Sequence, residues 1–389
     1  MVVAGGMLVM LTQFSISSNC FSLFVIPICK DLSFMRGQFS IAQSMLALGG
    51  ICAAVFSGKV FNRFGILRVM RISAAFAVLV YFLQSAVSTV PAFCVINFLL
   101  GFFNSFSTYV PISLLISDWF SARKNTVTGI AMMGSGFGTS IFNSLGSDLI
   151  LSFGWRTAMR ILALVMTLFI LAADFLLLKE APQSLARSSV REVNAADISR
   201  ESPFFTRRNS PVVVMCAVIS IAGGVLVYTA QPHLQDIGYS QTYAAHLFSV
   251  AMIVMAAGKI LHGMIIDRLG IRVSNTAIVF TASLGLMGLL MYRGTFSAVL
   301  VCVGMLFITS LNVVGAPALA EALGGAENKK FFLGKISACI NGGYMLAPAI
   351  YGAIYDRAGS YRLMYAASII LLFLCLPGIW RSLPAKRST

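Results

Sequence analysis

Long apolar runs alternate with short polar loops along almost the whole chain, and one long polar stretch interrupts this pattern near the middle. A membrane-spanning helix needs about 20 predominantly apolar residues, whereas a transmembrane β-barrel has alternating segments of about ten residues. The run lengths therefore predict an all-α integral membrane protein with twelve transmembrane helices. The predicted spans are residues 2–28, 38–58, 69–90, 92–117, 126–150, 157–178, 211–232, 242–265, 273–292, 295–319, 331–355 and 361–380.

The polar stretch covers residues 179–210 and leaves six predicted spans on each side. We expect residues 1–178 to form an N-terminal six-helix bundle, 179–210 to form a cytoplasmic linker, and 211–389 to form a C-terminal six-helix bundle. The charges of the linker indicate a solvated loop rather than a folded domain.

Three landmarks recur across the midpoint in the same order. The segment GKVFNRFGILR begins at Gly58. A similar segment, GMIIDRLGIR, begins 205 positions later at Gly263. Two further pairs recur 206 positions apart, namely Pro111 with Pro317, and Trp155-Arg156 with Tyr361-Arg362. This repeat predicts two homologous bundles related by a pseudo-two-fold axis through the membrane, an arrangement typical of carriers that rock around a central site.

Composition and charge agree with a membrane protein. Hydrophobic residues make up 58% of the chain and charged residues 11%, and the net charge is +15. Most Lys and Arg residues fall in loops that are cytoplasmic if both termini are cytoplasmic, as the positive-inside rule favours for a plasma or inner membrane protein. The positive charge thus reflects topology and attraction to anionic membrane lipids, and it requires no nucleic-acid partner.

The sequence offers no sign of a nucleotide, metal or cofactor site. No Walker-type loop is present, and the eight cysteines and three histidines have no metal-ligand spacing. No Ser/His/Asp or Cys/His constellation suggests an enzyme. We therefore expect a protein without catalytic residues or cofactors, which works as a monomeric transport unit.

The repeated glycine-spaced loop resembles the signature of the major facilitator superfamily, Gly-x-x-x-Asp-Arg-x-Gly followed by two basic residues. The second copy matches with Gly263, Asp267, Arg268 and Gly270, and the first with Gly58, Arg63 and Gly65, whereas Asn62 stands where the family has Asp. The resemblance implies a transporter whose halves latch at the cytoplasmic side. It implies that this latch is intact at Asp267 and Arg268 and altered at Asn62.

A second resemblance covers residues 109–156. Its matching residues are Tyr109, Pro111, Trp119, Phe120, Arg123, Lys124, Gly129, Gly134, Gly136, Gly138 and the run Gly154-Trp155-Arg156. This pattern is similar to a run shared by monocarboxylate transporters and the bacterial oxalate/formate antiporter group, of which the antiporter group is the better match. The resemblance implies a secondary carrier, either an antiporter or a symporter, for small organic anions.

Lys259 is the key candidate for substrate binding. Both resembling families carry, four residues before the loop glycine, an Arg that binds the substrate carboxylate, and Lys259 holds this place ahead of Gly263. A Lys would act as a compact point charge rather than as a bidentate fork. Helical spacing puts Met255 and His262 on the same face. The alternative is that Lys259 snorkels to lipid headgroups from its place about two turns inside the helix end.

Two departures from the resembling families bear on the substrate. Met255 stands where monocarboxylate transporters have an Asp as the proton site, so proton coupling through that carboxylate lacks support. The second cation of the antiporter group has no clear counterpart, because its region reads Ile340-Asn341. With Lys259 as the single candidate cation in the site, a substrate with one negative charge is favoured over one with two.

Uncharged polar residues within spans complete the candidate site. Asn104 and Thr108 share one helical stripe with Asn97 and Gly101 in span 4. The other candidates are Gln13 in span 1, Tyr109 in span 4, Tyr228 in span 7, Asn312 in span 10, and Asn341 and Tyr344 in span 11. Amides and phenols suit a carboxylate or a small polar solute, but hydrogen bonds between helices account equally well for each of them.

Small residues and prolines within spans are candidates for conformational change. Gly134 and Gly138 narrow span 5 so that another helix can approach closely. Pro111, Pro317 and Pro348 each remove a backbone hydrogen bond and permit a bend. Arg123 lies in the adjoining loop and is also a candidate for gating.

The sequence therefore favours a carrier that moves a small organic anion, expected to be a monocarboxylate, by alternating access. One alternative is a carrier of neutral or cationic solutes, including drug efflux, which a buried acid would favour. The embedded acids Asp148 and Asp174 both lie near span ends. Another alternative is a carrier-like metabolite sensor that does not transport.

Overall fold

A computed structural model describes residues 1–389 except 121–123, 174–176, 179–208 and 385–389. The side chains at 58, 59, 62, 117, 118, 124–126 and 326–331 also lie outside the described part. The described residues form helices and turns without a β-strand. The chain divides into two compact units, Met1–Asn194 and Ala195–Thr389, which are described separately below.

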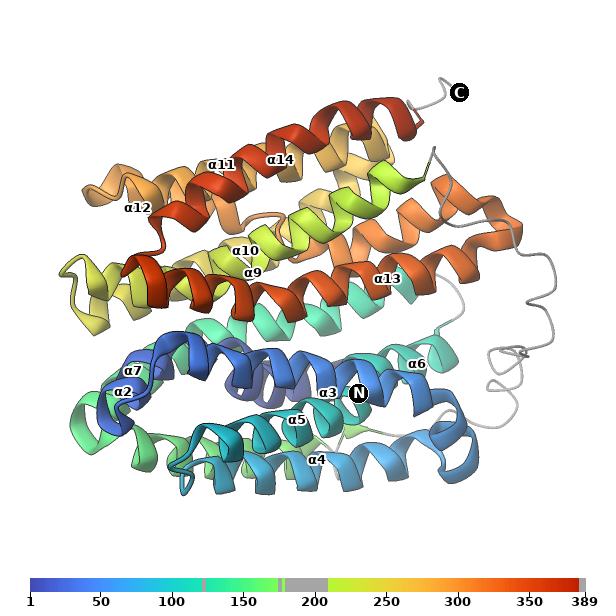
Figure 1. The fold of residues 1–389 in the computed structure, drawn as a ribbon. Helices are drawn as coiled ribbons and strands as arrows, with labels where there is room; N and C mark the ends of the chain where they lie inside the picture. The colour runs from blue at the N-terminus through green and yellow to red at the C-terminus, as the bar shows by residue number, and fades with distance from the viewer. Residues whose placement is uncertain (121–123, 174–176, 179–208, 385–389) are drawn as a thin grey trace. The chain divides into compact units, whose positions relative to one another are not determined.

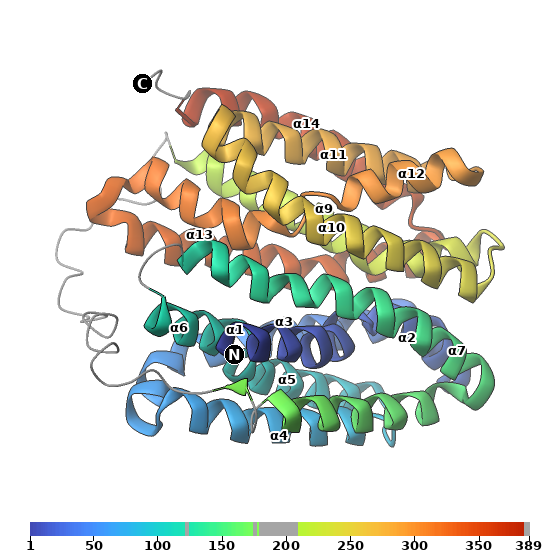
Figure 2. The same ribbon diagram turned by 180° about the vertical axis from the view of Figure 1, so that it is seen from behind.

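The first unit begins with a span whose middle is wound as a π-helix. This span consists of α1 (Val2–Val9), η1 (Met10–Asn19) and α2 (Phe21–Leu32) (Figure 1). It is followed by α3 (Arg36–Phe64), α4 (Ile66–Gln84), α5 (Val90–Ser107), α6 (Tyr109–Trp119) and α7 (Lys124–Ala172). The helix α7 reverses direction at Gly154, where φ is 76°, and therefore supplies two spans (Figure 2).

The second unit repeats this plan. It contains α9 (Ser210–Asp236), α10 (Gln241–Leu269), α11 (Ile271–Leu290), α12 (Gly294–Met305), η4 (Leu311–Gly315), α13 (Ala316–Ala358) and α14 (Arg362–Ser382). The helix α13 reverses at Gly325, where φ is 65°. One large apolar core, built from the inward faces of these helices, holds the unit together.

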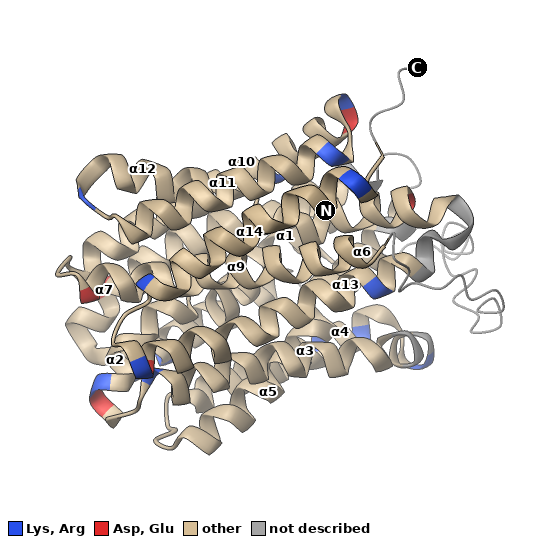
Figure 3. Ribbon diagram, turned by 45° about the horizontal axis from the view of Figure 1, so that its top comes forward, with Lys and Arg blue, Asp and Glu red and all other residues tan. Residues whose placement is uncertain are grey.

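The predicted fold class is confirmed, since the elements of the two units account for twelve spans. Within the described residues, nine helices are long and apolar enough to cross a membrane, and one of these windows, Val127–Ala172, contains both arms of α7. The tenth and eleventh predicted spans run through α12, η4 and α13 and are not among these nine; α12 is itself apolar but has only 12 residues. Charged residues lie mainly at helix ends, and the long middle stretches are almost free of them (Figure 3).

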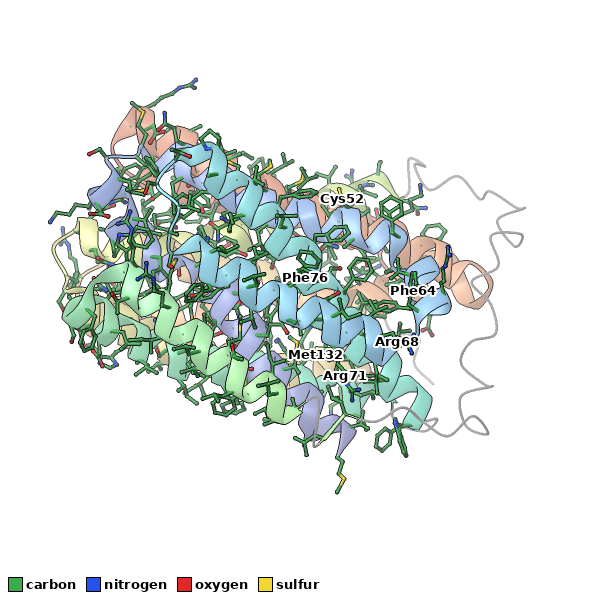
Figure 4. All side chains as sticks on the ribbon, turned by 90° about the horizontal axis from the view of Figure 1, so that it is seen from below. Cys52, Phe64, Arg68, Arg71, Phe76 and Met132 are labelled. Carbon is green, nitrogen blue, oxygen red and sulfur yellow. The ribbon has the colours of Figure 1, made fainter. Side chains whose placement is uncertain are left out.

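Two glycines of the repeated loop, Gly65 and Gly270, adopt a backbone conformation with positive φ. Gly65 ends α3 with a φ of 83°, and Gly270 ends α10 with a φ of 87°. Only glycine adopts this region of φ and ψ readily, so each helix stops there and the next one begins at once. In the first unit this sharp turn places Arg68 and Arg71 on the opening turns of α4, near Phe64 (Figure 4).

The Trp155-Arg156 landmark ties the start of the sixth span to the end of the first. Trp155 donates from Nε1 to the Asp31 carboxylate at 3.0 Å, and Arg156 forms an ion pair with the same oxygen. In the second unit, Asp236 lies 205 positions after Asp31 and lines a cavity together with Arg362, the repeat counterpart of Arg156. In both units, the repeated pair therefore lies where the last span begins, beside the end of the first span of that unit.

Candidate substrate-binding site

In the first unit, buried polar side chains gather where η1 packs beside the end of α5. Gln13 donates from its side-chain amide to the Asn104 oxygen at 2.9 Å and to the Ser107 hydroxyl at 2.5 Å. Asn104 in turn donates to Ser17 at 2.8 Å, and Ser17 donates to the Gln13 carbonyl at 2.6 Å. The interhelical hydrogen bonds that the sequence suggested for Gln13 and Asn104 are thus present, and they fix the register of two helices.

The fourth span breaks next to this cluster. Thr108 separates α5 from α6 with a φ of −114° and a ψ of −106°, and its hydroxyl donates to the Asn104 carbonyl at 2.6 Å. Tyr109 begins α6 and packs edge-on against Phe14 of η1, with ring centroids 4.8 Å apart. Pro111 follows and has no N–H, which helps to explain why the helix is interrupted here.

In the second unit, the corresponding tenth span is irregular over a longer stretch. After α12 ends at Met305, residues 306–309 form turns and Leu311–Gly315 form the π-helix η4. The next helix, α13, has Pro317 as its second residue. π-helical turns are rare and frequently lie at functional sites. Broken helices also free backbone groups to bind solutes in transporters.

Candidate residues from three spans meet around this irregular stretch. Tyr344 donates from its phenol to the Ile308 carbonyl at 3.2 Å, and Asn312 donates to Asn341 at 3.5 Å. The rings of Tyr228 and Tyr344 flank Gly224 of α9, because a methyl group at that glycine would lie within 4 Å of both. Asn312, Asn341, Tyr344 and Tyr228 therefore belong to one polar region of this unit.

Lys259 lies on α10, which also packs against the irregular stretch. Its neighbour Gly258 allows this approach, since a methyl group there would lie 1.6 Å from the Leu306 carbonyl oxygen. The Lys259 side chain is only 5% exposed. Among the described residues it is the one buried Lys, Arg, Asp or Glu, so its burial argues against the lipid-snorkelling alternative. Lys335, by contrast, is exposed on α13.

The candidate gating residues lie at helix ends, within helices and at a contact between two helices. Asp267 and Arg268 are exposed at the end of α10, and Pro348 lies inside α13. Gly134 and Gly138 face the first span, where added methyl groups would lie 2.3 Å from the Met7 carbonyl oxygen and 1.7 Å from that of Leu11. Arg123, Asp174 and the side chain of Asn62 lie outside the described residues. The roles of all these residues in gating stay predictions.

Some polar contacts have no counterpart in the sequence analysis. Ser15 donates to the Ser135 carbonyl at 2.8 Å, and Asn19 donates to Thr139 at 2.8 Å, so η1 and α7 are joined twice. Ser107 was overlooked because it lies beside, and not on, the stripe of Asn104 and Thr108. Its spacing of three residues from Asn104 is a signal that could have found it.

Comparison with known proteins places the chain in a family. The profile of the Major Facilitator Superfamily matches residues 5–319. Monocarboxylate transporter 12 of Rattus norvegicus is 26% identical, over 93% of this chain and 80% of its own length. An uncharacterized transporter of the same superfamily from Escherichia coli, YhjX, is 23% identical over 82% of this chain and 79% of its own length.

Solved structures share the fold at low sequence identity. A mutant form of the nucleoside transporter NupG superposes with a TM-score of 0.77 at 12% identity, and the match covers 98% of this chain and 99% of that one. The xylose transporter XylE of E. coli, in an inward-open conformation, superposes with a TM-score of 0.72 at 14% identity, covering 100% of this chain and 96% of that one. At these identities the likeness concerns the fold alone. The family profile spans most of the chain, and the chain therefore belongs to the Major Facilitator Superfamily of multi-pass membrane transporters.

Proposed function

We propose that the protein is a secondary active transporter that moves a small organic anion, namely a monocarboxylate, across the membrane by alternating access. The observation that carries this proposal is the burial of Lys259, the one buried side chain among Lys, Arg, Asp and Glu in the described residues. A charge inside a membrane protein is costly and usually marks a substrate or ion pathway. A cation on a substrate pathway favours a negatively charged solute over a cationic one.

The surroundings of Lys259 favour a small monoanion. Met252 and Met255 are buried on the same face of α10 and offer a soft apolar wall for a short carbon chain. A single ammonium group neutralises one carboxylate, and no second buried cation is present in the described residues to balance another. The amides of Asn312 and Asn341 and the phenol of Tyr344 would supply uncharged polar contacts. The names of the curated relatives agree with this substrate class.

Counterflow in proteoliposomes tests the proposal directly. Purified protein would be reconstituted into vesicles loaded with unlabelled formate, lactate, pyruvate or oxalate, or with an amino acid, a nucleoside or xylose. We expect labelled monocarboxylates to enter by exchange at least tenfold faster than in protein-free vesicles. Exchange of nucleoside or xylose without carboxylate exchange would favour the carrier of neutral solutes. Saturable carboxylate binding without any flux would favour a sensor.

The repeated loops make a separate prediction about the transport cycle. We expect Asp267→Asn to slow carboxylate exchange severalfold, because it removes a charge-assisted contact that would stabilise the outward-open state at the cytoplasmic end. Asn62→Ala is the matched control at the repeat-related position, and its exchange rate should stay within about twofold of wild type because an amide holds such a contact less strongly. Equal exchange rates for the two variants would contradict an unequal latch.

A further inference from the structure

His262 stands out among the buried polar groups of the second unit. Its side chain is 0% exposed, and within the described part of the chain neither Nδ1 nor Nε2 has a hydrogen-bond partner. An imidazole has one donor and one acceptor when it is neutral and two donors when it is protonated. Buried polar groups are almost always paired, and an exception calls for a physical explanation.

The ring lies against the irregular stretch of the tenth span. The His262 and Phe307 ring centroids are 5.8 Å apart, and a methyl group on Gly315 would lie 3.4 Å from Cε1 of the imidazole. The Ser310 carbonyl is the backbone acceptor that approaches the ring, but without the geometry of a hydrogen bond. Thr309 in the same stretch also has a buried hydroxyl without a partner among the described residues. Small movements of this stretch would therefore supply or remove partners for the ring.

Lys259 is the charged group closest to His262 along α10. The two residues are three positions apart, so their side chains lie on the same face of the helix. A carboxylate held by the Lys259 ammonium would therefore lie about one turn from the imidazole. A cation on His262 would attract that carboxylate, and without the carboxylate it would repel the ammonium.

Other titratable groups on the elements packed against α10 lie elsewhere. The stretch 306–315 has none, and α12 has only Cys302. On α11, Arg272 lies in the first turn and donates to the Leu383 carbonyl. The titratable groups of α9 are Cys216, Tyr228, His233 and Asp236, of which His233 and Asp236 lie at the end remote from His262. On α10 itself, Asp267 and Arg268 are exposed in the last turn, and Tyr243 and His246 lie near the opposite end.

We infer that His262 is a proton-binding site that couples proton movement to the anion bound at Lys259, in place of the carboxylate that Met255 lacks. The inference rests on the proposed function. Because the carboxylate and the proton each favour binding of the other, and such coupling is reciprocal, they bind together and are released together. One monocarboxylate and one proton carry no net charge, so the coupled step is electroneutral. A protonated imidazole has two N–H donors, and a carboxylate bound at Lys259 would offer it an acceptor.

The test uses proteoliposomes with an entrapped pH dye and inward gradients of lactate, formate and pyruvate in turn. We expect the wild-type protein to acidify the lumen as the carboxylate enters, at a rate unaffected by an imposed membrane potential. In His262→Gln, acidification and pH-driven accumulation should fall at least tenfold, carboxylate exchange should fall less, and its dependence on pH should flatten. His246→Gln, which changes an exposed histidine on the same helix, should behave as wild type.

Three outcomes would overturn the inference. The first is proton-coupled uptake that persists in His262→Gln, and the second is wild-type uptake that responds to membrane potential or leaves the lumen pH unchanged. The second outcome needs only the wild-type protein, so it applies even if the variant fails to fold. The third is the absence of carboxylate counterflow in the wild-type protein, which would refute the proposed function itself. The first two outcomes leave that function intact.

Discussion

Replacing Lys259 by alanine is expected to abolish carboxylate transport while the protein still inserts and folds. Removal of one partner of a buried ion pair costs about 3–5 kcal/mol in comparable cases, which corresponds to a loss of about a hundredfold or more in affinity. The apparent Km should therefore rise beyond the measurable range. Labelled uptake in proteoliposomes, at protein levels matched by size-exclusion chromatography, measures this effect.

Lys335→Ala is the matched control for this experiment. It removes the same side chain from another span of the same unit, but Lys335 is exposed whereas Lys259 is 5% exposed. Its uptake should stay within about twofold of wild type, since exposed charges contribute little to specific contacts. Near-normal carboxylate uptake by well-folded Lys259→Ala would refute the binding role.

Lys259→Arg extends the same prediction to selectivity. The guanidinium keeps the positive charge but presents a planar fork that pairs with a carboxylate through two hydrogen bonds. We expect this variant to retain part of the transport and to gain relative preference for planar anions such as oxalate over lactate. A loss of transport as complete as in the alanine variant would show that the shape of the site, and not the charge alone, decides binding.

The helices and their reversals could be predicted from the sequence because they depend on local properties. A span is defined by the length of an apolar run, and the repeated Gly65 and Gly270 mark sharp turns that few other residues permit. Both features are visible without any knowledge of packing. The spans that contain Pro111 and Pro317 are interrupted next to these prolines, whereas α13 continues through Pro348, so a proline by itself does not predict a break.

The arrangement of side chains within the bundles could not be predicted in the same way. Lipid is as apolar as a protein interior, so the faces of a membrane helix differ little in hydrophobicity. The sequence therefore could not show that Lys259 is buried and Lys335 exposed, although both lie within predicted spans. The π-helix of Met10–Asn19 likewise has no distinct sequence period, and the partners of Gln13 depend on how η1 and α5 are aligned.

The first arm of α7 packs closely against the first span, and the contact at Gly138 leaves no room for a larger side chain. Gly138 lies so close to the first span that a methyl group there would be 1.7 Å from the Leu11 carbonyl oxygen, while Gly129 of the same helix has no described atom within 4 Å of that position. The obstacle at Gly138 is backbone, so a rotamer change cannot relieve it. The two helices would have to move apart and would strain the bonds from Ser15 to Ser135 and from Asn19 to Thr139.

We therefore expect Gly138→Ala to destabilise the protein by about 1–3 kcal/mol or more, the range that is typical of overpacked sites. Gly129→Ala is the matched control and should leave stability near that of wild type or slightly higher, since alanine favours the helix more than glycine does. Thermal unfolding in detergent, followed by intrinsic fluorescence, would compare the two variants. Equal melting temperatures would mean that η1 and α7 are not in close contact at Gly138. A large loss of thermal stability in Gly138→Ala alone would confirm that the backbones of the first and fifth spans lie in close contact at this point.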